Sequence, residues 1–217
     1  MQVQHPLAVV TPTLDGDILT VLALSDARFT AGRIGKLMPT RSYNGIRKAL
    51  NRLADQGTVD VEQVGTIYSY TLNREHVAAA PIVALANLRG TLLNRIRAQI
   101  ASWPIQPVYA CVFGSTMRGQ MRPDSDIDIF VVRPDSADRP AWEQQTGELA
   151  TRVTRWTGND GRALQMAESE VRAGVGGEPV LDDIAELAAG TVAGDPAWLR
   201  RIVSKGRGTR RGLGSDE

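Results

Sequence analysis

Cysteine and histidine are scarce in this chain, and their scarcity excludes several kinds of site. The single cysteine, Cys111, cannot form an internal disulfide, which argues for a reducing compartment. It lies in the apolar segment VYACVF, where a cysteine usually packs as a small hydrophobe. The only two histidines, His5 and His76, are far apart in the sequence. We therefore expect neither a zinc site of Cys/His type nor a Ser-His-Asp triad.

Long apolar runs and a secretory leader are also absent. No unbroken apolar stretch approaches the roughly 18 residues that a membrane helix needs. The N-terminus has no basic segment followed by an apolar one, as a signal peptide would have. We expect a cytoplasmic protein without a membrane partner, folded as one large domain or two small ones.

The net charge of +1 conceals two local excesses of opposite sign. The segment from Arg28 to Arg52 contains seven basic residues and no acidic one. The segment from Asp124 to Asp138 contains five aspartates and one arginine. Local fields of opposite sign indicate two different ligands.

The first 75 residues have the pattern of three helices followed by a hairpin. Helical spacing of apolar residues predicts a helix in DGDILTVLALSDA, with Asp15 or Asp17 as its cap. It predicts a second helix in RFTAGRIGKLMPT, capped by Thr30, and a third in RSYNGIRKALNRLADQG, with Gly57 just past its end. Two strand-like stretches about a Gly-containing turn predict the hairpin.

This order of elements resembles the winged helix-turn-helix of transcriptional regulators over residues 14–73, with SYNGIRKALNRLADQG as the recognition helix and YSYTL ending the wing. The resemblance implies that the start of the recognition helix enters the major groove of double-stranded DNA. The residues expected to contact DNA are Arg41, Ser42, Tyr43, Asn44, Arg47 and Lys48. Such regulators are often homodimers. The alternative is a solvated basic face on a small helical domain.

The rest of the chain is expected to form a connecting helix, a second domain and a tail. An apolar stripe at helical spacing predicts one connecting helix over residues 76–104, between domains at residues 1–75 and 105–203. Strand and helix segments alternate in the second domain, so we expect an α/β (α+β) fold with a short mixed sheet flanked by helices. The Gly-rich, basic residues 204–217 are expected to be disordered.

The stretch VFGSTMRGQMRPDSDIDIFVV places two carboxylates at the start of an apolar strand. Asp126 and Asp128 are two residues apart, so a strand projects them to one face, while Ile127 and Ile129 point into the core. At an effective dielectric constant near 20, two such charges repel by about 2.5 kcal/mol. A divalent cation converts this repulsion into attraction, and Mg²⁺ is usually held by one or two carboxylates plus substrate phosphates.

Gly114 and Ser115 stand between a predicted strand and a predicted helix. Backbone N–H groups at the start of a helix favour an anion, and Gly114 lets the backbone approach a phosphate closely. The Ser115 hydroxyl can cap the helix or donate to a phosphate oxygen. With the two aspartates, these parts suit a nucleoside triphosphate with Mg²⁺, and the chemistry of phosphoryl or nucleotidyl transfer. The alternative is a polar turn followed by a solvated strand end.

The pattern GSTMRG…SDID resembles the signature of the DNA polymerase beta-like nucleotidyltransferases, most of all their minimal prokaryotic members, over residues 105–170. The resemblance implies that Gly114 and Ser115 bind the triphosphate of ATP and that Asp126 and Asp128 are catalytic residues that hold Mg²⁺. It also implies that Arg118 braces the loop or contacts a phosphate.

The family usually supplies a third carboxylate from a neighbouring strand. In ALQMAE, residues 163–168, the position that aligns with this carboxylate is Gln165. Glu168 lies three places further on, and therefore on the opposite face of a regular strand. A glutamine carries no charge and cannot accept a proton, which argues against full two-metal catalysis.

Two classes of function follow. The first is a Mg²⁺-dependent nucleotidyltransferase that moves AMP from ATP to a hydroxyl of a protein, such as a toxin, or of a small molecule. The second is a DNA-binding transcriptional regulator whose nucleotidyltransferase fold senses a nucleotide with little or no catalysis. An RNA-directed transferase is a weaker alternative, because the helix-turn-helix mainly reads DNA.

Overall fold

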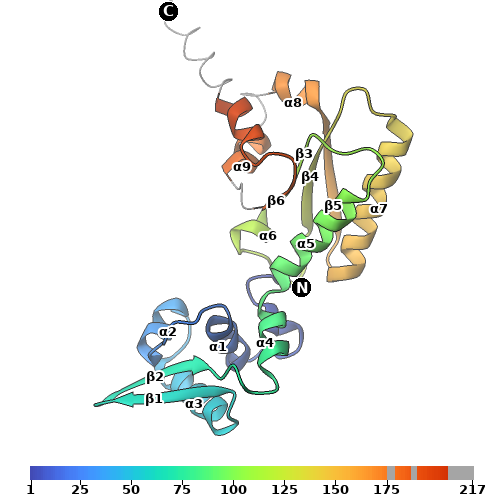
Figure 1. The fold of residues 1–217 in the computed structure, drawn as a ribbon. Coiled ribbons are helices and arrows are strands. Elements are labelled where there is room, and N and C mark those ends of the chain that lie inside the picture. The colour runs from blue at the N-terminus through green and yellow to red at the C-terminus, as the bar shows by residue number, and fades with distance from the viewer. Residues whose placement is uncertain (175–178, 187–189, 205–217) are drawn as a thin grey trace, which may run out of the picture. The chain divides into compact units, whose positions relative to one another are not determined.

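The computed structural model describes residues 1–174, 179–186 and 190–204. These residues belong to two compact units, Met1–Arg89 and Gly90–Glu217, which are described separately below (Figure 1). Residues 205–217 of the predicted disordered tail lie outside the described residues. Within the described ranges, every helix is too short or too polar to cross a bilayer.

The first unit consists of helices and one β-hairpin. Its elements are η1 (Pro6–Val9), α1 (Leu14–Ala23), α2 (Ala31–Leu37), α3 (Tyr43–Asp55), β1 (Val59–Val64), β2 (Ile67–Leu72) and α4 (Ala79–Ala86). The hairpin is antiparallel, with Val59 opposite Leu72 and Val64 opposite Ile67. Three helices followed by a hairpin match the order that the sequence predicts, and they are consistent with a winged helix.

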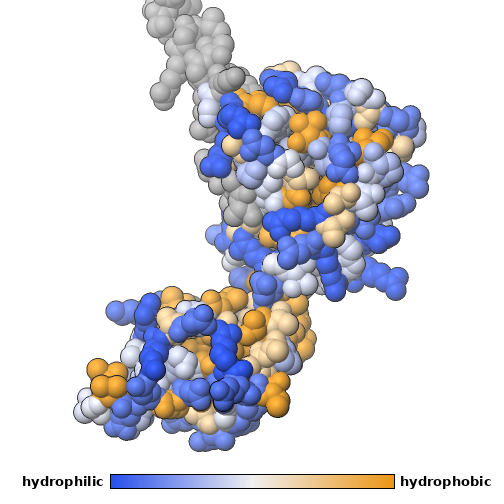
Figure 2. All heavy atoms as spheres, in the orientation of Figure 1, coloured by the Kyte–Doolittle hydropathy of each residue, from blue (hydrophilic) through white to orange (hydrophobic). Residues whose placement is uncertain are grey.

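The core of the first unit comes from the apolar stripes of its helices. The largest fully buried side chains are Ile18, Leu22, Ile34, Ile46 and Leu50, from α1, α2 and α3. Apolar side chains of the hairpin and α4 complete the same cluster. The faces visible in Figure 2 are mainly hydrophilic, with small apolar patches on both units.

The predicted caps are partly confirmed. Thr30 accepts a hydrogen bond from the backbone N–H of Arg33 at 3.1 Å and caps α2, as expected. The expected cap of α1 at Asp15 or Asp17 is wrong, because Thr13 occupies the N-cap position. Both aspartates lie inside the first turn, where the partial positive charge of the helix N-terminus favours carboxylates.

Gly57 ends α3 as predicted. Its φ of +71° lies in the left-handed region, which glycine adopts without steric cost. Its N–H donates to the carbonyl of Ala54 at 2.8 Å, and the N–H of Thr58 donates to the carbonyl of Leu53 at 3.1 Å. This pair of bonds is a Schellman motif, which satisfies the last carbonyls of the helix and turns the chain into β1.

The single connecting helix predicted over residues 76–104 is wrong. The chain forms two helices, α4 and α5 (Leu88–Ala101), separated at Asn87, whose φ and ψ are −96° and 24°. Asparagine is a poor helix former, so a break at this position costs little. The apolar residues of α4 pack into the core of the first unit, whereas most of α5 belongs to the second unit.

The second unit contains a four-stranded mixed sheet, as expected from the sequence. After α5 it consists of β3 (Tyr109–Phe113), α6 (Ser115–Arg118), β4 (Ile127–Arg133), α7 (Arg139–Thr157), β5 (Gly161–Ala167), α8 (Glu168–Gly174), α9 (Pro179–Glu186), β6 (Thr191–Ala193) and a helical segment over residues 198–204. The strand order is β5-β4-β3-β6. β3 pairs antiparallel with β4 and β6, and β4 pairs parallel with β5 through the crossover helix α7.

The two faces of this sheet are covered by different helices. Phe130 and Val132 of β4 pack in one apolar cluster with Val171, Leu181 and Ile184 of α8 and α9. Asp128, Phe130 and Val132 occupy every second position of β4, so they share one face of the sheet. α7 packs against β4 and β5, and Figure 1 shows α9 and α7 on opposite sides of the sheet.

Cys111 is fully buried in β3 on the face of Phe130, which confirms that it packs as a hydrophobe. Burial raises the pKa of its thiol to about 12. The reactive thiolate is therefore scarce at neutral pH.

Replacing Gly57 by alanine is expected to destabilise the first unit by about 1–2 kcal/mol, because a Cβ atom is disfavoured in the left-handed region. Gly32→Ala is the matched control, since Gly32 is exposed inside α2 and a Cβ there would meet only the Thr30 hydroxyl, at 3.9 Å. The control should be neutral or stabilising by up to about 1 kcal/mol. Urea unfolding followed by circular dichroism measures both. Equal effects would contradict the role of Gly57 in ending α3.

Candidate functional site

The antiparallel pairing of β3 and β4 brings the Gly114–Ser115 turn beside Asp128. Phe113, the last residue of β3, lies opposite Asp128 in the register, and Gly114 follows directly. Gly114 has a φ of +68°, and a Cβ atom built on it would lie 2.8 Å from the Oδ2 atom of Asp128. Any other residue at position 114 would therefore be strained and would collide with the carboxylate. This contact joins the turn and the carboxylate predicted from separate parts of the motif.

The turn leads into α6, which is a single turn of helix. Gly114 is its N-cap residue, and the N–H groups of Met117 and Arg118 both donate to the Gly114 carbonyl at 3.2 Å. Ser115 is the first helical residue, so the capping role expected for its hydroxyl is wrong. The first N–H groups of a helix have no acceptor within the helix, which leaves those of Ser115 and Thr116 to face an anion.

Arg118 holds α6 to another element of the same unit. Its guanidinium Nη2 donates to the Oδ2 atom of Asp183 in α9 at 2.7 Å. Both side chains are largely exposed, so this ion pair contributes little to stability. Both roles expected for Arg118, bracing the loop and contacting a phosphate, stay predictions.

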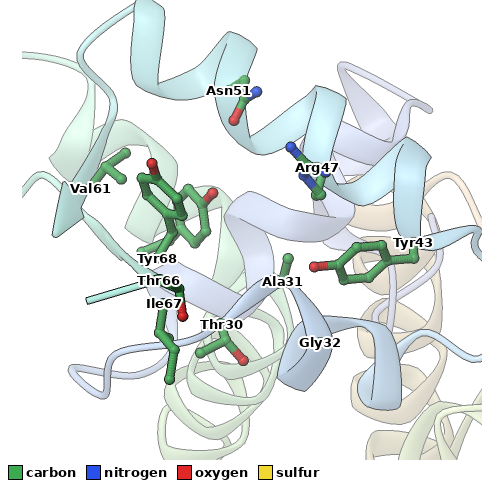
Figure 3. A pocket seen from close by; sticks show the side chains of 11 residues that line it. Thr30, Ala31, Gly32, Tyr43, Arg47, Asn51, Val61, Thr66, Ile67 and Tyr68 are labelled. Atoms are coloured by element: carbon green, nitrogen blue, oxygen red, sulfur yellow. The ribbon is translucent and has the colours of Figure 1, made fainter. Parts of the chain in front are cut away.

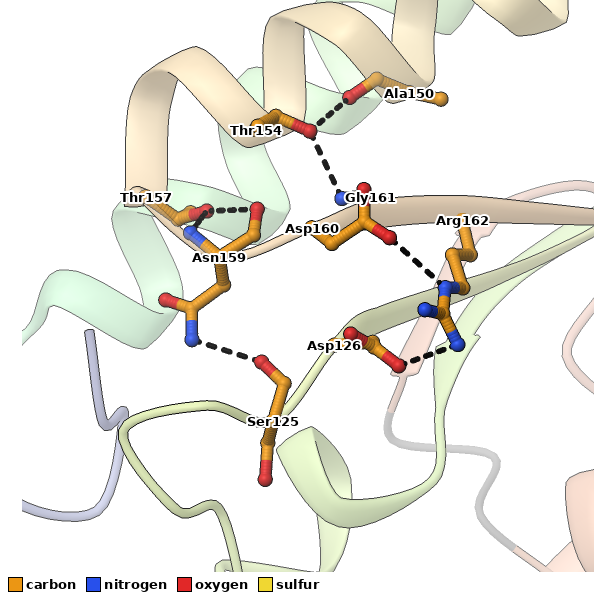
Figure 4. Close-up of polar contacts among 9 residues, drawn as sticks. All are labelled: Ser125, Asp126, Ala150, Thr154, Thr157, Asn159, Asp160, Gly161 and Arg162. Atoms are coloured by element: carbon orange, nitrogen blue, oxygen red, sulfur yellow. Dashed lines mark hydrogen bonds and ion pairs between the residues drawn. The ribbon is translucent and has the colours of Figure 1, made fainter.

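An arginine that the sequence motif does not include partly neutralises the negative charge of the carboxylate pair. Nη1 of Arg162, in β5, lies 2.6 Å from Oδ2 of Asp126, which is the last residue before β4 (Figure 4). Nε of Arg162 donates to Oδ2 of Asp160 at 3.0 Å. The guanidinium therefore lies between two carboxylates that come from different strand ends.

Asp128 has a less favourable environment than an exposed carboxylate. Burial raises the pKa of Asp128, and the negative charge of Asp126 raises it further. The positive charge of Arg162 lowers the pKa of Asp128, but by less than the other two effects raise it. Asp128 thus gains from any further positive charge placed beside it.

The interpretation of Gln165 as the replaced third carboxylate is wrong. In the parallel register of β4 and β5, Gln165 lies opposite Val131, whereas Arg162 lies opposite Asp128. Side chains of directly paired residues share a face, so Gln165 projects to the face away from Asp128. It lines a small hollow of about 240 Å³ with Trp142 of α7.

Glu168, the other acidic candidate, is also unavailable to Asp128. It begins α8 instead of ending β5, and its carboxylate pairs with Arg172 at 2.6 Å. Among the described residues, no cluster of three or more His, Cys, Asp or Glu side chains is arranged to hold a metal ion. Two carboxylates are the number that usually holds one Mg²⁺ together with phosphate oxygens, and metal binding by Asp126 and Asp128 stays a prediction.

Asn159 holds the loop that carries Asp126. Its side chain is almost fully buried, and its Nδ2 atom donates to the carbonyl of Ser125 at 2.8 Å (Figure 4). The same atom donates to the carbonyl of Pro123 at 3.2 Å. The N–H of Ile127 also donates to the carbonyl of Asp160 at 2.8 Å. The sequence motif does not reveal Asn159, because its partners lie more than 30 residues away.

A second site lies in the first unit, between α3 and the hairpin. A groove of about 760 Å³ is lined by Thr30, Ala31, Gly32, Tyr43, Arg47, Asn51, Val61, Thr66, Ile67, Tyr68 and Tyr70 (Figure 3). Tyr43, Arg47 and Asn51 are four residues apart and so share one face of α3. The groove therefore contains two of the predicted DNA-contacting residues, Tyr43 and Arg47. Tyr68 and Tyr70 were not among the predicted residues. The face of the hairpin from which their side chains project depends on the register of the two strands.

The other predicted DNA-contacting residues are also exposed, but two of them make structural contacts. Arg41 pairs with Asp17 of α1 at 3.0 Å. The hydroxyl of Ser42 caps α3 by accepting from the N–H of Gly45 at 3.1 Å. Asn44 and Lys48 are exposed on α3. Contact of any of the six residues with DNA stays a prediction.

Residues 93–175 match the family model described as the nucleotidyltransferase domain. This part of the chain is a nucleotidyltransferase domain of the polymerase beta-like type, and the family uses a nucleoside triphosphate with a divalent metal. Comparison with curated proteins finds no match.

Three solved structures are similar to this chain at low identity. One is a toxin-antitoxin with AMP-PNP, with 19% identity, a TM-score of 0.36, and coverage of 56% of this chain and 88% of that chain. The second is a mutant of the toxin-antitoxin MntA-HpeT, with 18% identity, a TM-score of 0.38, and coverage of 56% and 88%. The third is a tri-AMPylated Shewanella oneidensis HEPN toxin in complex with MNT antitoxin, with 17% identity, a TM-score of 0.33, and coverage of 58% and 88%.

Asp128→Asn is expected to raise the melting temperature of the metal-free protein at pH 7. Because the pKa of Asp128 is raised in the folded state, the unfolded chain ionises first as the pH rises, and stability falls across that interval. At pH 7 the full cost of the charge is present, and asparagine removes it. The advantage of the variant should shrink as the pH falls through the raised pKa and then below the ordinary carboxyl pKa.

Asp124→Asn, in the same loop and exposed, is the control and should change the melting temperature little. Scanning calorimetry between pH 3 and pH 8 measures all three proteins. A variant at position 128 that is less stable than the wild type at pH 7 would show that Arg162 already overcompensates the charge.

Proposed function

We propose that the nucleotidyltransferase domain binds a nucleoside triphosphate at the Gly114–Ser115 turn, with one Mg²⁺ at Asp126 and Asp128. The oxygen of an acceptor hydroxyl attacks the α-phosphate and loses its proton to solvent, the bond between the α- and β-phosphates breaks, and pyrophosphate leaves. We also propose that the first unit is a winged helix-turn-helix that binds double-stranded DNA. The observation that carries the first proposal is the close approach of Gly114 to Asp128. It puts the unpaired N–H groups of the turn next to a carboxylate, as a metal-bound triphosphate requires.

Each residue of the site has a separate task. The N–H groups of Ser115 and Thr116 and the Ser115 hydroxyl bind phosphate oxygens. Asp126 and Asp128 hold the metal, which when bound neutralises the charge that develops on the phosphate. Asn159 positions Asp126 through the carbonyls of its loop.

The acceptor side of the site is open along the edge strand β5. Arg162 and Leu164 are exposed on the same face as Asp128, and Leu164 is 38% exposed although it is apolar. Exposed side chains on this edge strand leave room for a protein as well as for a small molecule. We propose AMP from ATP as the transferred group and a protein hydroxyl, such as that of a toxin, as the acceptor.

The alternative function is a transcriptional regulator in which the domain senses a nucleotide and transfers little. The observation that favours it is Arg162, a cation at the strand position that faces Asp128. Its guanidinium also has the second neighbouring carboxylate as a partner, because Nε donates to Asp160 at 3.0 Å. Such a site holds a nucleotide, but Arg162 neutralises the carboxylates of Asp126 and Asp160 that could otherwise accept the proton of an attacking hydroxyl.

Asp128→Asn should lower Mg²⁺-dependent ATP affinity by at least about tenfold, because one of the two charged ligands of the metal is lost. Isothermal titration calorimetry with ATP, with and without Mg²⁺, measures the effect. Asp124→Asn is the control and should bind as the wild type does. Mg·ATP affinity that is unchanged in Asp128→Asn would remove the metal assignment.

The fate of the α-phosphate distinguishes the two functions. ATP labelled at the α-phosphate is incubated with the protein and an extract of the cells that produce it, and the products are separated by electrophoresis. An enzyme leaves label on an acceptor, and Asp128→Asn does not. Absence of label, together with DNA affinity that changes on addition of Mg·ATP, would establish the sensor.

The groove of the first unit supports the DNA proposal by its chemistry. Its lining contains the cation Arg47 and five hydroxyl side chains, and none of its eleven lining residues is acidic. The acidic residues of the hairpin, Asp60 and Glu62, pair with Thr71 and Ser69 on the opposite face of the two strands. A phosphate backbone can therefore approach the groove without meeting a carboxylate from the hairpin.

Arg47→Ala should weaken binding of duplex DNA by about tenfold at low salt and reduce the slope of log affinity against log salt by about 0.9, the value for one phosphate contact. Fluorescence anisotropy with DNA from the promoter of the protein's own gene measures both quantities. Arg155→Ala removes the same charge from α7 and should leave DNA binding unchanged. DNA affinity that is equal in the wild type and Arg47→Ala would remove this residue from the interface.

A further inference from the structure

Arg162 occupies a place that a bound metal would also use. It lies opposite Asp128 in the register, it pairs with Asp126 at 2.6 Å, and its side chain is 61% exposed. Two cations repel each other, so a divalent cation at the Asp126 carboxylate would compete with Arg162. The metal-free site therefore already contains a positive charge that belongs to the chain.

We propose that Arg162 is an internal counter-ion of the Asp126–Asp128 pair, which a divalent cation displaces and which then binds a phosphate of the nucleotide. The displacement depends only on the carboxylates and the arginine. The phosphate contact rests on the proposed function, because it requires a nucleotide at the Gly114–Ser115 turn.

The contacts of the guanidinium make such a displacement possible. Nη1 faces Asp126, whereas Nε faces Asp160, at 2.6 and 3.0 Å. Breaking the contact with Asp126 leaves the second contact in place, so Arg162 stays at the mouth of the site when the metal enters (Figure 4). Its freed N–H groups then match the geometry of phosphate oxygens, which arginine binds in a bidentate way.

The same placement limits the number of metal ions. Arg162 presents a fixed positive charge from β5, on the face that Asp128 shares. The guanidinium would repel a second divalent cation that approached the carboxylates from that side. The site therefore binds one divalent cation, and binds it less tightly than the two carboxylates alone would.

Manganese tests the displacement without any nucleotide. The electron paramagnetic resonance signal of free Mn²⁺ is titrated with wild type, Arg162→Gln and Arg162→Lys. Arg162→Gln should bind Mn²⁺ at least about fivefold more tightly than the wild type, because the competing charge is gone. Arg162→Lys keeps the charge and should resemble the wild type. Arg155→Gln, an exposed arginine of α7, is the control and should also resemble it.

Equal Mn²⁺ affinities of the wild type and Arg162→Gln would overturn the displacement. Matching circular dichroism spectra and melting temperatures ensure that the comparison concerns folded proteins. Because Arg162 is exposed, its replacement by glutamine should not unfold the domain.

ATP tests the phosphate contact at saturating Mn²⁺. Arg162→Gln should bind ATP at least about fivefold more weakly than the wild type, although it binds the metal more tightly. Unchanged ATP affinity would overturn the phosphate contact. Failure of ATP to bind the wild type would overturn the proposed nucleotide site and this contact with it, whereas the Mn²⁺ titration would still decide the displacement.

Discussion

Two carboxylates at the start of one strand need a counter-charge, and the second unit is arranged around that need. Asp128 is half-buried beside Gly114, where water screens its charge poorly. Asp126 is more exposed and lies against Arg162. A protein that had no use for the pair would gain stability by replacing one carboxylate with a neutral side chain. We therefore propose that the pair is a site for a divalent cation, because Arg162 offsets the cost of the Asp128 charge only in part.

The sheet brings three separate segments of the chain to this pair. β3 contributes the Gly114–Ser115 turn, the loop held by Asn159 contributes Asp126, and β5 contributes Arg162. Each is fixed by backbone pairing or by a buried hydrogen bond. A rigid framework of this kind keeps the N–H groups that we propose bind phosphate and the carboxylates in one geometry without a ligand, which reduces the cost of binding one.

Local features of the site could be predicted from the sequence, whereas features that depend on strand register could not. The cap at Thr30, the left-handed Gly57 and the spacing of the Gly114–Ser115 and Asp126–Asp128 elements depend on a few neighbouring residues. The residue of β5 that lies opposite Asp128 of β4 is 34 residues further along the chain, after α7. Its identity therefore depends on the exact point at which β5 begins to pair with β4. An error of three residues in that alignment pointed to Gln165 instead of Arg162. The contact of Arg41 with Asp17 could not be predicted either, because it joins residues 24 positions apart whose proximity depends on how α1 and α3 pack.

Displacement of Arg162 from Asp126 by a divalent cation would give the second unit two distinct states. The direct test is a crystal structure of the protein with Mn²⁺ and a non-hydrolysable ATP analogue, using the anomalous signal of manganese to locate the metal. The account predicts one manganese peak bonded to Asp126 and Asp128, phosphates at the Gly114–Ser115 turn, and Arg162 released from Asp126 toward a phosphate. A bound nucleotide with the Arg162–Asp126 ion pair intact and no manganese between the aspartates would contradict it.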